Sequence, residues 1–579
     1  MSRRNLLPFL MAIIATFELS AEYHLKSTKN VGYPQEKLPV PNTCCLDSNA
    51  LKGQTNTIYF GSAVEPSIAI NPKDSHHIVA CWLQDQIDNG GALEIGIAYT
   101  SNQGESWKRS EIPLQICMGG SKQRVTSASL AWSADGSRVY LSGIAVNANA
   151  IPNARNQQAV FVTVSDDGGK TWSNPDNIGS SVTTLNSNHL FAKDEKISIT
   201  TDPQNPLNAF AVWHRYSEGL SHHSDSMICR TSDAGATWSA LHLLYNPFRD
   251  LCSLNQSNCI ENNCQITKNL TLVLPERFSQ DKEWKNDKWG DNHNKADRFS
   301  GDLLHFVQRK YAAVDASSDE YVADTGPIQY KHTLFDIAMV RSQDKGKTWD
   351  PGAHVLVPAT TLYPALFSGG YDSEYNGSGT QIHTEGQSLS CALNKKNGFL
   401  YVVYQAHGQI NLLTSRDGGY SWSHPVEVSL TPNLALNRQA FAPSVAVTDD
   451  GHVGILYSDF RFDNTLNLDE TKTDKWLAIY KEHSDEHGAS TGIGLNLVKE
   501  VRLTDESYVA QNGPKVHNKV FSDASALVSQ GNTFYAIYTK THSGPFFEVT
   551  DIARDAASDT AVVADFNQRQ SPYISIIKP

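Results

Sequence analysis

The sequence predicts an all-β fold, a β-propeller in which four-stranded units repeat around a central axis. Three observations carry this prediction. A short motif rich in Asp, Gly and Trp recurs, its copies are spaced with a period, and the segments between them have the composition of short strands and turns. We favour seven units; six is the alternative if the first and last sets of strands share one sheet.

The recurring motif has the pattern Ser/Thr-x-Asp-x-Gly-x-x-Trp. The four strict copies are "SDDGGKTW" (165–172), "TSDAGATW" (231–238), "SQDKGKTW" (342–349) and "SRDGGYSW" (415–422). A weaker copy is "TSNQGESW" (100–107), and a decayed copy is "SDEHGAST" (484–491). Asp side chains accept backbone N–H bonds in turns, Gly tolerates a positive φ, and Trp packs a large ring between sheets. The motif therefore predicts a turn between the third and fourth strands of each unit, with calcium binding as the alternative interpretation.

The Trp residues that end the motif set the period. The interval from Trp107 to Trp172 is nearly the same as the interval from Trp172 to Trp238. The next interval, from Trp238 to Trp349, is much longer, which predicts an insertion in the fourth unit at about 245–299. This insertion is either a lid over one mouth of the propeller or an excursion on its surface.

Each unit shows the same order of segments. An apolar strand bounded by Pro or Ser, such as "EPSIAINP" (65–72), is followed by a second strand and then by a third that leads into the motif. Short β-branched and aromatic runs divided by Gly, Asp, Asn and Pro are typical of strands and turns. The first strands are expected to begin near Glu65, Ser127, Lys196, Gly301, Glu385, Pro443 and Asp523.

The N-terminus predicts export. Two Arg residues precede the apolar run 6–17, and the pair Ser20-Ala21 offers a cleavage point with small side chains. The run is shorter than a membrane span, so we expect a secreted or periplasmic protein with no membrane span after signal removal; a retained anchor is the alternative. We therefore divide the chain into a signal peptide (1–21), an N-terminal lead segment (22–56) and the propeller (57–579), which contains the repeats.

The composition argues against a nucleic-acid partner. The chain of 579 residues has a formal net charge of −13, whereas nucleic-acid binding needs stripes of Lys and Arg. Its nine Cys are an odd number, so at least one thiol has no partner within the chain. A disulfide is expected among Cys252, Cys259 and Cys264, and a zinc site completed by His293 is the alternative. We predict no cofactor and no metal, and the oligomeric state is left open.

The motif copies resemble the Asp-box, or BNR, repeats of the sialidase superfamily, and this resemblance covers the chain from about Gly61 to the C-terminus. The stretch "EPSIAINPKDSHHIVACW" (65–82) is most similar in style to exported bacterial BNR-repeat proteins. The resemblance implies a β-propeller and a glycoside hydrolase of exo-sialidase type that acts on terminal sugars. The partner that it implies is a glycan or glycoconjugate.

The connectivity of such units predicts where a site would lie. In an up-and-down unit the first strand begins at the face where the second strand ends, and the first strands line the axis. Polar residues at these two places should therefore converge on one mouth, where carboxylates, Arg and His suit acid/base chemistry and sugar binding. The candidate catalytic residues are Glu385, Asp85 and Glu65, and the candidate substrate-binding residues are Arg215, Arg461, Asp459, His407 and Asp523.

The sialidase pattern is matched in part. Sialidases, as the family implies, hold the sugar carboxylate with three Arg and use a Tyr nucleophile activated by a Glu. Asp85 resembles the acid/base Asp and Glu385 the Glu partner, but Gln405 and His407 stand where an Arg is expected. Phe521 stands at the Tyr position, and Phe has no nucleophilic group. The alternatives are therefore a non-catalytic propeller that binds a glycan or a protein, and a scaffold with a structural metal at its axis.

Overall fold

The computed structural model describes most of the chain in segments. The described residues are 23–32, 57–88, 90–114, 120, 122, 124–147, 157–175, 192–217, 224–247, 264–275, 301–313, 332–358, 382–383, 389–406, 408–431, 439–464, 470–482, 495–516, 519–521, 525–542, 563–565 and 568–579. Within them the chain forms strands and one short 3-10 helix, η4 (Ala510–Asn512). The predicted all-β class is confirmed. No helix among these residues is long and apolar enough to cross a bilayer.

The strands of the described residues form seven antiparallel units. The first three are β2 (Thr57–Ile70), β3 (Ile78–Ile87), β4 (Ala92–Thr100) and β5 (Lys108–Ser110); β6 (Arg124–Trp132), β7 (Val139–Asn147) and β8 (Gln157–Ser165); and β9 (Ala192–Thr201), β10 (Ala209–Ser217), β11 (Ser224–Thr231) and β12 (His242–Tyr245). The fourth and fifth are β13 (Cys264–Val273), β14 (Leu303–Ala313), β15 (His332–Ser342) and β16 (His354–Val357); and β18 (Leu389–Leu393), β19 (Leu400–Ala406), β20 (Gln409–Ser415) and β21 (Val426–Glu427). The sixth is β22 (Ala440–Val447), β23 (His452–Asp459), β24 (Lys472–Glu482) and β25 (Leu495–Arg502), and the seventh is β29 (Ser525–Gln530), β30 (Thr533–Thr541), β32 (Gln570–Lys578) and β1 (His24–Asn30).

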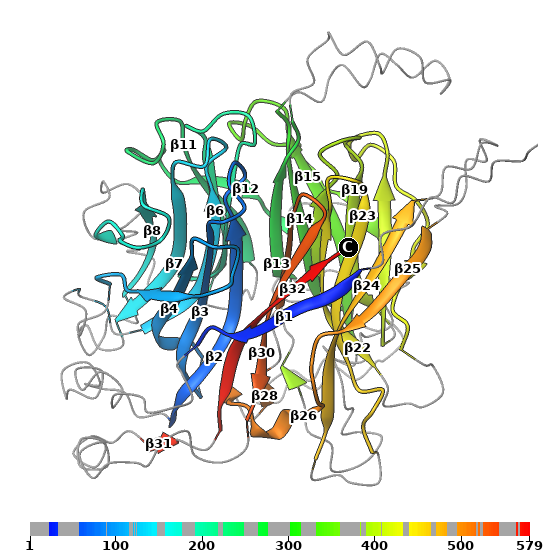
Figure 1. Ribbon diagram of the computed structural model, residues 1–579. Helices are drawn as coiled ribbons and strands as arrows, with labels where there is room; N and C mark the ends of the chain where they lie inside the picture. The colour runs from blue at the N-terminus through cyan, green and yellow to red at the C-terminus, as the bar shows by residue number, and fades with distance from the viewer. Residues whose placement is uncertain are drawn as a thin grey trace, which may run out of the picture.

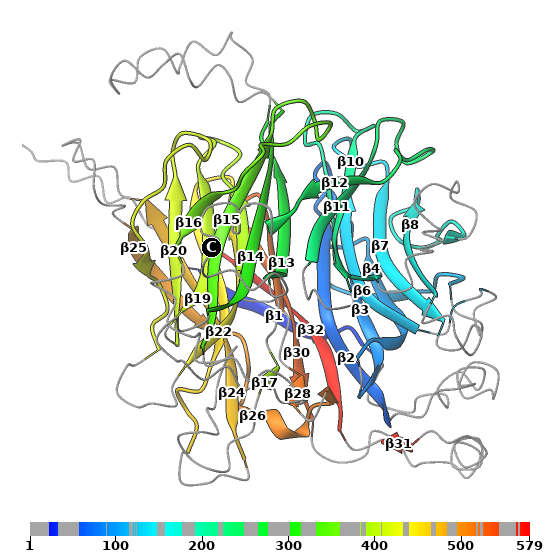
Figure 2. The same ribbon diagram turned by 180° about the vertical axis from the view of Figure 1, so that it is seen from behind.

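The first strands of these units form a closed ring. Each contacts the first strand of the next unit, in the order β2, β6, β9, β13, β18, β22, β29 and back to β2. In Figure 1 the first unit lies on the left and the sixth on the right, with β32 and β1 of the seventh unit between them, and the fourth unit is seen in front in Figure 2. Radial repetition of this kind leaves few open sheet edges, which is the advantage of a propeller.

The hydrophobic core is divided among the contacts between neighbouring units. Seven apolar clusters among the described residues each join two adjacent units, from the first and second round to the seventh and first. A sheet with a neighbour on both faces buries both of its faces, and therefore β3 reads as the continuous apolar run "IVACWL". Its Trp82 has no solvent exposure and packs in the cluster between the first and seventh units.

The ring is closed by the two ends of the chain. The outer strand of the seventh unit is β1, which pairs antiparallel with the C-terminal strand β32, so that Thr28 lies opposite Ser575. The predicted lead segment 22–56 therefore supplies a strand of the last unit, although the predicted boundary leaves it outside the propeller.

The fourth unit also differs from the prediction. Its first strand is β13, Cys264–Val273, which lies within the predicted insertion 245–299. The strand expected to begin near Gly301 is β14, the second strand of that unit. The reason is the long interval between β13 and β14. The first strand of the unit is expected after this interval, whereas it lies before it. The remainder of the insertion lies mostly outside the described residues.

Three short strands lie apart from the units. Ile382–His383 (β17) pairs in parallel with β28 (Lys519–Phe521), which pairs with β27 (Lys515–Val516). In both views this small sheet lies at the lower end, where β2 begins (Figures 1 and 2). The chain enters the fifth unit after β17 and the seventh after β28, so this sheet joins the approaches to two first strands. Two further short strands, β26 (Tyr508–Val509) and β31 (Val563–Asp565), pair with β24 and β2.

The recurring motif forms the turn after the third strand of its unit. In the copy 165–172, Asp167 Oδ1 accepts the backbone N–H groups of Lys170 and Thr171 at 3.0 and 2.9 Å, and the Ser165 hydroxyl at 2.8 Å. The copies at 342–349 and 415–422 repeat these bonds, and the copy at 231–238 repeats those from its first Thr and from Thr237. Asn102 takes the place of Asp in the copy at 100–107. The decayed copy at 484–491 lies outside the described residues.

The conserved Gly of the motif places each turn against the preceding unit. Gly169 has a φ of +89°, and a Cβ at this position would lie 2.8 Å from Val79 of the first unit. The equivalent Gly104 of the first unit lies in the same way against Ile576 of the seventh. The motif therefore fixes neighbouring units to one another in addition to closing a hairpin.

Candidate functional site

The seven first strands enclose a central channel. Its volume is about 240 Å³, and each of the seven strands contributes to its lining. Seven equivalent positions, one on each strand, face it: Ser67, Ser129, Ser198, Asn269, Ser390, Ser444 and Ala526. Six of these seven positions carry a small polar side chain, although the sheets of the molecule pack through apolar contacts.

These serines bond the neighbouring strand of the ring. Ser67 Oγ accepts the backbone N–H of Leu130 at 3.3 Å, and Ser444 Oγ accepts that of Leu527 at 3.0 Å. Ser129 and Ser390 accept the N–H groups of Ile199 and Val445 in the same way. First strands of adjacent units are thus tied together by side chains, because their backbones do not pair with each other in a ladder.

Bulges turn charged side chains into the channel. The register of the first two strands shifts at five first strands, β2, β6, β9, β13 and β22, between Val64 and Ser67 in the first case. Glu65, Lys196 and Ala442 at these shifts have φ values of 50°, 53° and 51°, in the left-handed region that non-glycine residues rarely adopt. Each such residue costs on the order of 1–3 kcal/mol of backbone strain, and bulges and strain gather at functional sites.

Two lysines and one carboxylate share the channel. Lys196 Nζ forms an ion pair with Glu65 Oε1 at 2.9 Å. Lys268 of β13 also lines the channel, and it has no hydrogen bond or ion pair among the described residues. Burial, followed by the charge of Lys196, lowers the pKa of the Lys268 amine to about 8. Among the described residues of the lining, the charges therefore sum to an excess of one positive charge at neutral pH.

Asp85 is buried beside β2, outside the lining of the channel. Its Oδ1 accepts the backbone N–H of Gly61 at 2.8 Å and the Gln84 side-chain amide at 2.9 Å. Burial raises the pKa of the Asp85 carboxyl to about 6, although both hydrogen bonds and the charge of Arg109 act in the opposite direction. Glu65 lines the channel and Asp85 does not, so these two predicted catalytic residues do not share the channel lining.

Arg215, at the end of β10, is held by a carboxylate of its own unit. Its guanidinium forms two parallel bonds to Asp194, with Nε to Oδ1 at 2.8 Å and Nη2 to Oδ2 at 3.1 Å. The indole N–H of Trp213 donates to the same carboxylate at 3.0 Å. This bidentate geometry is the strong form of an Arg–carboxylate pair, and it uses the face that would otherwise bind a ligand carboxylate.

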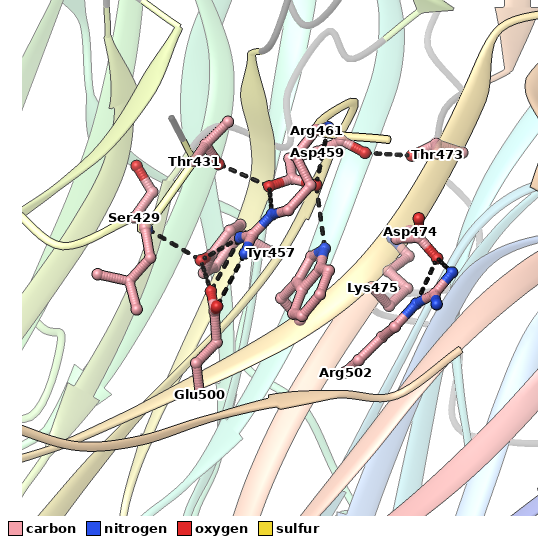
Figure 3. Close-up of polar contacts among 12 residues, drawn as sticks. Ser429, Thr431, Tyr457, Asp459, Arg461, Thr473, Asp474, Lys475, Glu500 and Arg502 are labelled. Carbon is pink, nitrogen blue, oxygen red and sulfur yellow. Dashed lines mark hydrogen bonds and ion pairs between the residues drawn. The ribbon is translucent and has the colours of Figure 1, made fainter. Parts of the chain in front are cut away.

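Arg461 and Asp459 lie together with Tyr457 and Glu500 in a cluster of the sixth unit (Figure 3), and Trp476 contacts both of the first two residues. Arg461 bonds Asp459 and, at 2.8 Å, Glu500, and its guanidinium carbon lies 3.8 Å from the centre of the Trp476 ring. Asp459 Oδ1 accepts the indole N–H of Trp476 at 3.0 Å, and burial raises the pKa of this carboxyl.

Tyr457 in this cluster donates to Glu500 and accepts from Arg461 at 3.1 Å. Its ring is fully buried between the fifth and sixth units, and burial together with Glu500 raises the pKa of its hydroxyl. A buried Tyr whose proton is bound this firmly is a structural donor in this arrangement. The cluster ties the end of β23 to β24 and β25.

Three predicted site residues lie outside the described residues: Glu385, His407 and Asp523. Conversely, Lys268 and the equivalent serines are not among the predicted site residues. A signal for the serines is present in the chain, because "EPSIAI" (65–70), "KISITT" (196–201) and "APSVAV" (442–447) carry Ser at the third position. No such repeat marks Lys268, since none of the other first strands has a lysine directly before the equivalent position.

No family model matches the sequence, and no curated protein matches it. Solved structures are similar to it at low identity. Polysaccharide lyase Uly1 is similar with 10% identity and a TM-score of 0.44, over 96% of this chain and 99% of that one. The intramolecular trans-sialidase from Ruminococcus gnavus has 11% identity and a TM-score of 0.37, with 91% and 96% of the two chains covered. An alpha-L-arabinanase from Penicillium chrysogenum has 12% identity and a TM-score of 0.36, with 70% and 93% covered. These values are too low to carry an argument about activity or substrate.

Proposed function

We propose that this chain is an exported, glycan-active propeller, a glycoside hydrolase of exo-sialidase type that acts on terminal sugars. The observation that supports the proposal best is the closed ring of first strands, which gathers strained, charged residues from distant parts of the chain at one axis. Polar groups that converge in a concave site are the usual basis of ligand binding. The resemblance of the motif copies to sialidase repeats supports the same class of function.

In this proposal Asp85 is the proton donor. A carboxyl whose pKa is raised to about 6 keeps its proton close to neutral pH and can give it to the oxygen of a leaving sugar. Glu65 is the carboxylate that faces the channel, and Glu385 is the further catalytic candidate. Arg215, Arg461 and Asp459, with His407 and Asp523, are proposed for the binding of substrate.

Substitution of Asp85 tests the hydrolase proposal. Purified protein is assayed with a fluorogenic sialoside and a panel of aryl glycosides, together with the variant Asp85→Asn. Loss of one positioned acid is expected to lower kcat/KM by about 10²–10⁴-fold. The matched control Asp449→Asn changes an exposed Asp on the turn before β23 and should keep full activity. Turnover that is unchanged in Asp85→Asn would remove Asp85 from the mechanism.

A non-catalytic glycan-binding propeller is the second candidate. It is favoured by the bonds of Arg215 and Arg461, whose guanidinium groups are already held by carboxylates of the protein. Under this alternative all glycosides of the panel stay uncleaved, while the same protein binds sugars on a glycan array. Cleavage of any one substrate excludes it.

A further inference from the structure

Several serine hydroxyls in the lining of the central channel have a proton that no described group accepts. Four hydroxyls, those of Ser67, Ser129, Ser390 and Ser444, each accept a backbone N–H from the next first strand. None of the four has an acceptor for its own O–H among the described residues. A hydroxyl carries one donor and two acceptor lone pairs, so its proton remains available to a further partner.

The described lining of the channel also carries more positive than negative charge. Lys196 and Lys268 face the space from the neighbouring strands β9 and β13, and Glu65 from β2 is the carboxylate in the lining. Glu65 bonds Lys196 at 2.9 Å, which leaves Lys268 without an ion pair of its own among the described residues. An ammonium group away from bulk water is costly unless it is paired.

We propose that the central channel binds a small monovalent anion, held by the Lys268 ammonium and by serine hydroxyls of the first strands. One negative charge cancels the excess positive charge of the two lysines and one carboxylate. The hydroxyl protons supply the donors that replace the hydration of the anion. A volume of about 240 Å³ holds a halide ion together with a few water molecules.

A cation does not suit this lining. Hard cations take several oxygen ligands from carboxylates and carbonyls, whereas the carboxylate of Glu65 is already bonded to Lys196. No group of three or more His, Cys, Asp or Glu side chains within the described segments is placed to hold a metal ion. The described lining instead offers an ammonium group and hydroxyl protons, which are groups that bind anions.

Anion binding is expected to weaken as the pH rises above about 8. The groups that act on Lys268 are Lys196, Glu65 and Cys391, and the pKa of the amine is lowered to about 8 by burial and by Lys196. Below this pH the amine is an ammonium and attracts the anion. Above it, the neutral amine provides no charge. A bound anion stabilises the ammonium and moves this transition to higher pH.

Crystals of the full chain grown in sodium bromide test the proposal directly. Anomalous scattering is expected to show bromide in the channel within hydrogen-bond distance of Lys268 Nζ. In the variant Lys268→Met this peak is expected to be lost, while it stays in Lys170→Met, which changes an exposed lysine on a motif turn. A channel that contains only water in the wild-type crystals contradicts the proposal, and so does a bromide peak that is unchanged in folded Lys268→Met.

A solution measurement gives a second reading that does not depend on activity. The melting temperature is measured at pH 7 and constant ionic strength while sodium gluconate is replaced by sodium chloride. A ligand that binds only the folded state stabilises it progressively above its dissociation constant, so the wild type and Lys170→Met are expected to gain stability. Lys268→Met is expected to lose this gain. An equal response of all three proteins overturns the proposal.

Discussion

Glu65, Lys196 and Lys268 illustrate how position on the ring decides the state of a side chain. All three lie on first strands and face one channel, yet only the first two form an ion pair. The ammonium of Lys268, which has no ion pair among the described residues, is desolvated by the surrounding strands, and its pKa is lowered to about 8. In the absence of an anion this residue therefore works against folding at neutral pH.

Removal of the Lys268 charge is expected to stabilise the protein at low halide. Between pH 8 and 10.5 the unfolded chain binds the proton that the folded chain has released, so the cost of Lys268 is present below pH 8 and disappears toward pH 10.5. Lys268→Met should raise the free energy of unfolding by about 1–3 kcal/mol at pH 7, with the gain fading at high pH. Denaturant unfolding in halide-free buffer at neutral and at high pH measures this. A loss of stability that does not change with pH contradicts the expectation.

The pH dependence of hydrolysis is argued from Asp85. If this carboxyl donates the proton, activity needs its protonated form, and the pKa of about 6 then sets the basic limb of the profile. We expect kcat/KM for the cleaved glycoside to fall as the pH rises through about 6. Asp85→Asn should leave residual activity without this limb. A basic limb at the same pH in the variant would assign it to another group.

The motif turn acts on two levels: it closes a hairpin of its own unit, and it packs against the preceding unit. Asp167 accepts N–H and O–H groups from its own turn, and Gly169 lets that turn approach Val79 of the preceding unit. The hydrogen bonds from Thr171 and Ser165 outweigh burial and lower the pKa of the Asp167 carboxyl. This contribution to stability is present above the usual pKa of Asp and is lost as the pH falls through the lower folded value.

Asp167→Ala is expected to lower the free energy of unfolding by about 1–2 kcal/mol, the typical cost of losing a side-chain acceptor for backbone N–H groups. The adjacent Asp166→Ala is the matched control, since Asp166 is exposed and pairs with Arg138 on the surface. A surface pair of this kind contributes about 0–1 kcal/mol. Equal effects of the two substitutions in a denaturant titration would show that the turn bonds add nothing.

The sequence predicted those parts of the fold that depend on a few neighbouring residues of the chain. The motif turns and the first strands at Glu65, Lys196 and Pro443 follow from a few adjacent residues. The strand β13 was missed because its unit contains long intervals that disturb the period. The pairing of β1 with β32 joins segments from opposite ends of the chain, and no local pattern signals it. For the site, the sequence identified Glu65 as a polar residue at a first strand, but the unpaired state of Lys268 depends on what three strands bring together.

The whole molecule depends on closure of the ring. Seven apolar clusters join neighbouring units, and the last one requires the seventh unit to lie against the first. This unit is completed by β1 from the N-terminus, so that the C-terminal strand β32 has a partner on both sides. If the ring were open, the first strands would not enclose a channel, and Glu65, Lys196 and Lys268 would face solvent.

Removal of β1 is expected to weaken this closure. A chain that begins after Val31 leaves one edge of β32 unpaired, and an unpaired edge favours association with other chains. We expect a lower melting temperature and concentration-dependent association in light scattering. A truncated chain as stable and monodisperse as a chain that lacks only the predicted signal peptide would show that β1 does not contribute.

A disulfide across the closing strands tests the central claim most directly. Thr28 and Ser575 lie opposite each other in β1 and β32, with 2.7 Å between their hydroxyl oxygens. In the double variant Thr28→Cys/Ser575→Cys, oxidation is expected to link these two positions, and mass spectrometry of the non-reduced digest should recover the joined peptides. The link should also raise the melting temperature relative to the reduced protein. Two free thiols at these positions in the folded, oxidised protein would contradict the closed ring.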